Sequence, residues 1–127
     1  MNGLHIVSFG TSLSARGGWQ ADLAAQLRER LNSEIEISII AQPGANSDWG
    51  IDNVARVAAL QAQVVPIEFA INDASIVRGL SLASSRDNLA AIAAALRAVA
   101  PHPRLVLMTM NPAHGLRGAA RPLLDRY

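Results

Sequence analysis

Three short polar segments of this chain contain residue types that can perform acyl transfer. They are Gly10-Thr11-Ser12, Pro43-Gly44-Ala45-Asn46-Ser47 and Ala70-Ile71-Asn72-Asp73. Acyl transfer needs a hydroxyl nucleophile and hydrogen-bond donors aimed at the developing oxyanion, each donor being worth roughly 3 to 4 kcal/mol of the barrier in known hydrolases. Ser12 is the candidate nucleophile. The candidate donors are the Ser12 amide, the side-chain amide of Asn72 and the amide of Gly44, which lacks a Cβ and lets the backbone approach a ligand closely.

Each of these segments follows an apolar stretch that is typical of a β-strand. The pattern predicts strands over residues 4–9, 34–40, 67–70 and 105–110. The third strand is expected to pair only from Ile67 onward, because Pro66 cannot donate a ladder hydrogen bond. The second strand alternates apolar and polar residues, as an edge strand does, whereas the fourth is apolar throughout and is expected to have a neighbour on each side. Because ligands bind at the carboxyl ends of parallel strands, the three polar segments are expected to converge there.

Apolar residues at helical spacing separate these strands. The spacing predicts a helix from near Trp19 to Leu31 and another around Ile51 to Val57. A loop over residues 71–84 should lead to a helix that Ser84 caps with help from Asp87 and that Pro101 ends, and a last helix should open at Pro122. The alternation of strands and helices predicts an α/β fold, with a parallel sheet covered on both faces and right-handed crossovers.

Length and composition narrow the function. The chain has 127 residues, half of them apolar, which fits one domain over residues 1–127 with one core. A net charge of +1 gives no electrostatic footprint for nucleic acid or an anionic membrane, so a small-molecule partner is expected. There is no cysteine, and the three histidines have no metal-ligand spacing. No signal peptide or membrane span is evident, and the sequence therefore predicts a cytoplasmic protein without a cofactor or metal.

Phe9-Gly10-Thr11-Ser12-Leu13-Ser14, Gly44 and Ala70-Ile71-Asn72-Asp73 resemble the first three conserved blocks of the SGNH, or GDSL-type, esterases and lipases. The resemblance implies a flavodoxin-like three-layer α/β/α sandwich with strand order 2-1-3-4-5. It implies that Ser12 is the nucleophile, that the Ser12 amide, Gly44 and Asn72 form the oxyanion hole, and that the substrate is a carboxylic ester. Thr11 replaces the family's usual aspartate and Ala70 replaces its usual glycine, but neither position carries the nucleophile or a donor.

One family feature is missing from these residues. The family places its catalytic aspartate and histidine in an Asp-x-x-His block near the C-terminus, and no such block occurs here. Only about seventeen residues follow the fourth predicted strand, too few for a crossover helix and a fifth strand. We therefore expect a chain truncated at its C-terminus. His5 and His102 belong at the opposite rim of the sheet, which leaves His114, oriented by Asp73 or Asp125, as the resident alternative base.

Each feature also has a structural interpretation. Hydroxyl residues around Ser12 are common at helix starts, and Gly44 after Pro43 is typical of a turn. Asn72 and Asp73 suit turn chemistry, and Trp19 and Trp49 suit packing.

Two other functions stay open. In the first, the protein is a flavodoxin-like binder of phosphate or nucleotides that uses the loop after the first strand. In the second, it is a non-catalytic relative of the esterases that has lost its base.

Overall fold

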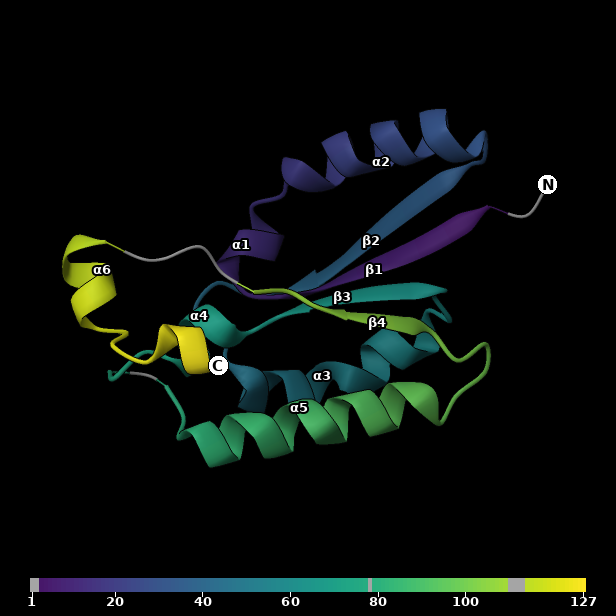
Figure 1. The fold of residues 1–127 in the computed structure, drawn as a ribbon. Coiled ribbons are helices and arrows are strands. Elements are labelled where there is room, and N and C mark those ends of the chain that lie inside the picture. Colours follow the sequence, from purple (N-terminus) through teal and green to yellow (C-terminus); the bar gives the residue numbers. More distant parts are fainter. Residues whose placement is uncertain (1–2, 78, 110–113) are drawn as a thin grey trace.

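A four-stranded parallel sheet forms the centre of the protein. The computed structural model describes residues 3–77, 79–109 and 114–127. The strands are β1 (Leu4–Gly10), β2 (Ile35–Ala41), β3 (Val64–Glu68) and β4 (Arg104–Leu107). They lie in the order β2-β1-β3-β4, and every pairing is parallel (Figure 1). The predicted α/β class and the order 2-1-3-4 are confirmed, and so is the edge position of β2.

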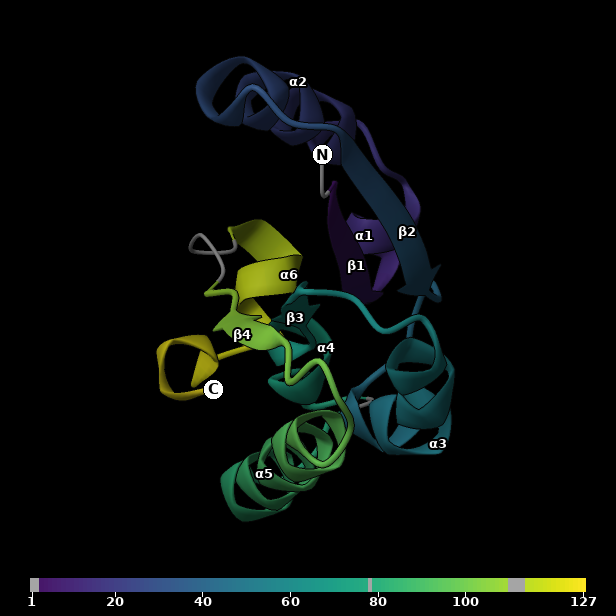
Figure 2. The same ribbon diagram turned by 90° about the vertical axis from the view of Figure 1, so that its right-hand side faces the viewer.

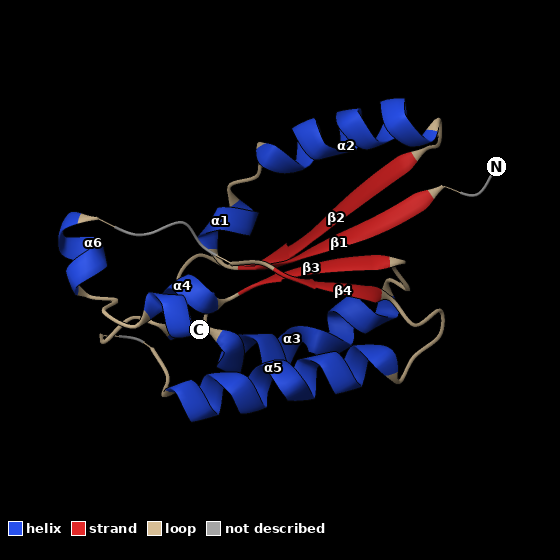
Figure 3. Ribbon diagram, in the orientation of Figure 1, coloured by secondary structure: helices blue, strands red, loops and turns tan. Residues whose placement is uncertain are grey.

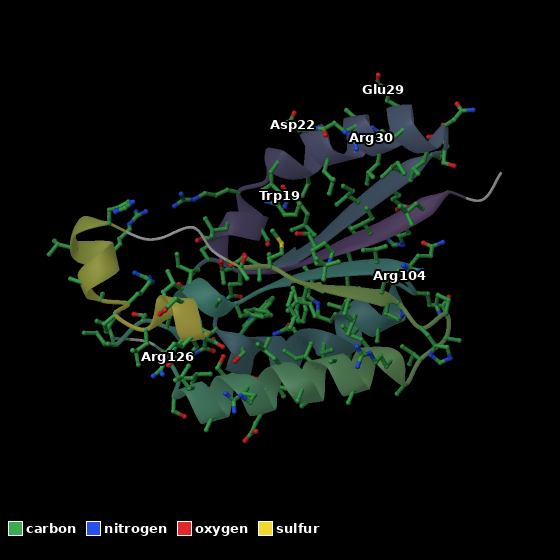
Figure 4. The ribbon with its side chains drawn as sticks, in the orientation of Figure 1. Trp19, Asp22, Glu29, Arg30, Arg104 and Arg126 are labelled. Carbon is green, nitrogen blue, oxygen red and sulfur yellow. The ribbon has the colours of Figure 1, made fainter. Side chains whose placement is uncertain are left out.

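Helices cover both faces of this sheet. α1 (Ser12–Ala15) and α2 (Trp19–Leu31) lie over one face, and α3 (Ser47–Ala59) and α5 (Leu82–Arg97) lie over the other (Figures 2 and 3). Three short elements lie beside the carboxyl ends of the strands: α4 (Ala70–Asp73), α6 (Gly115–Ala119) and a 3-10 helix (Leu124–Arg126). On α2, the charged side chains of Asp22 and Glu29 point away from the sheet (Figure 4). The result is the predicted three-layer sandwich.

The main core lies between the sheet and the α3–α5 layer. Its centre is an aromatic cluster in which the rings of Phe9 and Phe69 meet edge to face at 5.1 Å, with the Trp49 ring 5.9 Å and 6.2 Å from them. The packing around Gly50 in α3 is tight, because a Cβ at that position would lie 2.9 Å from both the Phe69 ring and the Ile92 side chain. The expectation that Trp49 packs within the fold is confirmed.

The third strand begins earlier than predicted. β3 starts at Val64, which pairs with Ile6 of β1 and with Arg104 of β4. Pro66 pairs with Val106 of β4, but the pairing with β1 passes from Val64 to Ile67 and omits the two residues between them. Because proline has no N–H, it interrupts one ladder and leaves the other intact. The prediction that pairing starts at Ile67 was therefore wrong.

The segment between β3 and α5 also differs from the prediction. It was expected to be a loop, but it opens with the single helical turn α4. Ser81, not Ser84, is the N-cap of α5, and its hydroxyl accepts a hydrogen bond from the Ser84 amide at 3.1 Å. Two serines three residues apart offer the same side chain, and only the backbone decides which one caps, because a cap needs an extended conformation. At the other end, Pro122 lies between α6 and the 3-10 helix and opens neither.

β4 differs most from its prediction. It ends at Leu107, whereas the sequence predicted a strand reaching Met110, a residue outside the described part of the chain. Within the described ranges β4 pairs with β3 alone, and Val106 and Leu107 are 47% and 61% exposed. The expected second neighbour is thus missing from the described sheet.

Among the residues that the structure describes, no helix has the length and apolarity needed to cross a membrane.

Candidate active site

Ser12 lies at the point where β1 turns into α1. Thr11 is the N-cap of α1, and its carbonyl accepts hydrogen bonds from the Ser14 and Ala15 amides at 3.1 and 2.9 Å. The Thr11 hydroxyl accepts a longer bond from the Leu13 amide at 3.4 Å. The first N–H groups of a helix have no acceptor within that helix, so the amide of Ser12, the first helical residue, is available to a ligand. The half-buried Ser12 thus combines a hydroxyl and an available amide at the carboxyl end of β1.

Glu68, the last residue of β3, holds this turn from the side. Its side chain is 1% exposed and accepts hydrogen bonds from the Thr11 amide (3.0 Å), the Thr11 hydroxyl (2.6 Å) and the Ser14 hydroxyl (3.0 Å). Gly10 leaves the space for this contact, since a Cβ there would lie 2.6 Å from Glu68 Oε1. Sequence reasoning missed Glu68. The signal was a single acidic residue at the end of an apolar strand.

Gly44 lies in a tight turn after β2. The Ala45 amide donates to the Gln42 carbonyl at 3.1 Å, and Gly44 has a φ of 78°. Proline at the second position of a turn and a glycine with positive φ at the third are typical of a type II turn, so the structural interpretation of this segment is correct. The Gln42 amide also donates to the Gly10 carbonyl at 3.1 Å, which ties the turn to the end of β1.

Asn72 lies in α4, and its side chain reaches the same turn. Its amide nitrogen donates to the Ala45 carbonyl at 2.7 Å. A side-chain amide has two N–H donors, so this bond leaves the second hydrogen for another acceptor. This bond joins the second and third predicted segments directly. Gln42 and Glu68, which lie just before these two segments, bind the first segment, so all three lie together at the carboxyl edge of the sheet. The catalytic roles of Ser12, Gly44 and Asn72 stay predictions.

A second buried carboxylate, Asp73, supports the segment that carries Asn72. Asp73 is fully buried, and its two oxygens accept hydrogen bonds from the Ser47 amide (2.7 Å) and the Ser85 hydroxyl (2.6 Å). Asn88 of α5 adds a bond to the Ser47 hydroxyl at 3.0 Å. The start of α3, α4 and the start of α5 are therefore joined through one side chain. From the sequence, Asp73 was interpreted as a turn residue or as a partner of a histidine. The hydrogen-bond network could not be predicted, because it joins residues far apart in the chain.

The histidines do not complete the site among the described residues. His5 bonds the Ser38 hydroxyl at 2.8 Å, and His102 bonds the Arg97 carbonyl at 2.8 Å. His114 is the exposed N-cap residue of α6, and no hydrogen bond within the described ranges joins it to Ser12. Both Asp73 oxygens accept hydrogen bonds from other residues, and no hydrogen bond within the described ranges joins Asp73 to His114. The described residues also contain no group of three His, Asp or Glu side chains that could hold a metal ion.

The fold and the site define the protein's structural class. It is a three-layer α/β protein whose polar loops meet at the carboxyl edge of a parallel sheet. The model of the GDSL-like Lipase/Acylhydrolase family matches residues 6–127. The chain belongs to this family of hydrolases. The resemblance inferred from the three sequence blocks is thereby confirmed.

Solved structures share this fold. The SGNH-hydrolase family esterase AlinE4 has a TM-score of 0.76 and 26% identity, with 98% of this chain and 68% of that chain covered. The lipase/acylhydrolase from Enterococcus faecalis has a TM-score of 0.80 and 23% identity, covering 97% of this chain and 66% of that one. TesA has a TM-score of 0.73 and 24% identity, with 94% and 69% covered. This chain thus spans about two thirds of the length of each. A comparison with curated proteins finds no significant match.

Proposed function

We propose that the intact protein hydrolyses carboxylic esters through an acyl-enzyme formed on Ser12. One observation carries the proposal: Ser12 begins a helix directly after the first strand, in a turn that Glu68 anchors to the neighbouring strand. Membership of the GDSL-like lipase and acylhydrolase family and the fold shared with esterases support the reaction class. The substrate is a small ester. Its acyl chain and alcohol are selected by segments such as residues 71–81.

In the proposed reaction, the Ser12 hydroxyl attacks the carbonyl carbon of the ester. Ser12 Oγ forms a bond to that carbon, and the carbonyl oxygen takes the negative charge. The Ser12 amide, the Gly44 amide and the second N–H of the Asn72 side chain donate to this oxyanion. The tetrahedral intermediate then collapses and the C–O bond to the alcohol breaks. A water molecule then attacks the acyl carbon, the bond from that carbon to Ser12 Oγ breaks, and the carboxylic acid leaves while Ser12 Oγ takes back a proton.

A histidine takes the Ser12 proton and passes it to the leaving alcohol, because a serine without a base is a poor nucleophile. His5 and His102 are engaged away from Ser12, so we propose a histidine from outside residues 1–127, with an aspartate that orients it. His114 is the alternative base within residues 1–127. Reading the gene past Tyr127 tests this point directly, since an in-frame Asp-x-x-His supports the external base and its absence favours His114.

Covalent labelling tests the nucleophile. The protein is incubated with a fluorophosphonate, with and without imidazole as an added base, and the modified residue is identified by mass spectrometry. Phosphonylation of Ser12, and its loss in Ser12→Ala, supports the proposal. Labelling that needs imidazole indicates an external base. If labelling without imidazole disappears in His114→Ala, then His114 is the base.

Turnover tests the reaction. The intact protein is expected to hydrolyse a short-chain p-nitrophenyl ester faster than its Ser12→Ala variant. If the two proteins hydrolyse the ester at the same rate and Ser12 is never labelled, the chain is a non-catalytic member of its family and the proposal is wrong. Tight binding of phosphate or flavin by such a chain favours the nucleotide-binding alternative.

A further inference from the structure

Glu68 has no part in the reaction as described, yet it is an unusual residue for its place. It lies at the end of a buried strand and is 1% exposed. Within the described residues no cation lies close enough to form an ion pair with it, and its partners are the amide and hydroxyl of Thr11 and the hydroxyl of Ser14. Burial of a charge without an ion pair is costly. An apolar side chain at this position would leave the buried Thr11 amide and the Thr11 and Ser14 hydroxyls without their acceptor.

All three donors to Glu68 come from the two residues that flank the Ser12-Leu13 dipeptide. Oε1 receives the Thr11 amide and the Ser14 hydroxyl, both at 3.0 Å, and Oε2 receives the Thr11 hydroxyl at 2.6 Å. One carboxylate thus holds the residue before Ser12 by its backbone and side chain, and the second residue after it by its side chain. The side chain of Gln20 binds the Ser14 carbonyl at 2.8 Å and restrains the far end of the turn.

Gly10 shows how closely Glu68 approaches the turn. A Cβ at Gly10 would lie 2.6 Å from both the Glu68 carbonyl oxygen and Oε1, and 2.8 Å from the Ser14 hydroxyl. Any side chain at position 10 would therefore displace the carboxylate or the Ser14 hydroxyl. The residue before Thr11 therefore has to be glycine for Glu68 to form its hydrogen bonds with Thr11 and Ser14.

We propose that Glu68 is a positioning residue for Ser12. Its carboxylate holds the Thr11–Ser14 turn so that the hydroxyl and the amide of Ser12 keep one orientation toward the ester carbonyl. A reacting group has to be held to within a fraction of an ångström by neighbours that are themselves fixed, and a small misplacement costs a large factor in rate. The inference rests on the proposed function, because it assigns Glu68 a role only if Ser12 is the nucleophile.

Glu68→Gln is the decisive variant. A carboxamide has one acceptor oxygen in place of two, so the Thr11 hydroxyl has to reverse and accept from the new NH2 group, and the charge is lost. The side chain keeps its shape. We expect the rate constant for Ser12 phosphonylation at saturating fluorophosphonate to fall about tenfold, the factor for weakening one hydrogen bond to a charged group. The half-saturating concentration should stay unchanged, because the reagent's own contacts are kept.

Three further variants separate positioning from stability. Glu36→Gln alters an exposed glutamate on β2 and should label like the wild type. Leu96→Ala removes a fully buried core side chain of α5 that lines a cavity near the amino end of β3, so it lowers stability without touching the turn. Measured where all variants are folded, it should also label at the wild-type rate. Ser14→Ala removes one donor to Glu68, and combined with Glu68→Gln it should slow labelling by less than the product of the two single effects.

The outcomes are distinct. If wild-type Ser12 is not labelled even with imidazole, the proposed function fails and this inference fails with it. If the wild type is labelled and folded Glu68→Gln reacts at the same rate, the proposed function stands and the positioning role is refuted. Equal slowing in Glu68→Gln and Leu96→Ala also refutes it. Faster hydrogen exchange of the Thr11 amide in Glu68→Gln supports it independently of activity, since that amide donates directly to Glu68.

Discussion

Replacing Asp73 tests how the fold supports the segment that carries Asn72. The Asp73 side chain is fully buried and accepts hydrogen bonds from the Ser47 amide at 2.7 Å and the Ser85 hydroxyl at 2.6 Å. Ser47 begins α3 and Ser85 lies in the first turn of α5. Asp73→Ala therefore leaves two buried donors without their acceptor, at the point where three helices meet.

The expected cost follows from these two bonds. Each buried donor that loses its partner costs about 1 to 3 kcal/mol, so Asp73→Ala should lower the free energy of unfolding by about 2 to 6 kcal/mol. Asp73→Asn should cost only about 1 to 2 kcal/mol, because its oxygen can still accept from the Ser47 amide while the Ser85 hydroxyl rotates to accept from the new NH2 group. Removing the Ser85 hydroxyl in the Asp73→Ala background should cost little more, since that hydroxyl has already lost its acceptor.

Urea unfolding followed by tryptophan fluorescence provides the measurement, because the Trp49 ring packs against the aromatic core. Asp87→Ala, an exposed aspartate on α5, is the matched control and should change stability by less than about 0.5 kcal/mol. The reasoning is refuted if Asp73→Ala stays within about 1 kcal/mol of the wild type, or if Asp73→Asn is as destabilising as Asp73→Ala. Strict additivity of Asp73→Ala and Ser85→Ala would contradict the direct bond.

Three further substitutions test other contacts. Gly10→Ala places a Cβ 2.6 Å from the Glu68 carbonyl oxygen, so it should lower the free energy of unfolding in urea by about 1 to 3 kcal/mol and slow the labelling of Ser12. Wild-type stability and labelling would contradict the close contact between Glu68 and the Thr11–Ser14 turn. Gly50→Ala gains about 1 kcal/mol of helix propensity but overpacks the core, so melting temperature should fall, and a rise would show that the aromatic cluster yields easily. Asn46→Ala removes the N-cap of α3, whose side-chain oxygen accepts hydrogen bonds from the Asp48 and Trp49 amides, so it should lower the free energy of unfolding in urea by about 1 kcal/mol. Asn46→Asp keeps a capping oxygen and should retain the wild-type stability.

The order of strands and helices was predictable because hydrophobic periodicity is a local property. The apolar run before Ser12 and the alternation of Ile35, Ile37 and Ile39 gave the correct element types for β1 and β2. Element boundaries were less predictable. Ser81 and Ser84 are equivalent as caps in the sequence, and Pro66 could only be recognised as part of β3 once each of its two neighbouring ladders was known.

The residue types and spacing of the sequence were enough to place three polar segments after three strands and to indicate the family, and they made Ser12, Gly44 and Asn72 candidate site residues. Motifs and hydrophobic periods are local features of the chain. Only the tertiary structure revealed Glu68 and Asp73 as the carboxylates that hold these segments. Glu68 binds residues 54 and 57 positions away, and Asp73 binds residues 12 and 26 positions away. Such contacts arise from the pairing of β1 with β3 and from the packing of α3 beside α5, and no local pattern encodes them.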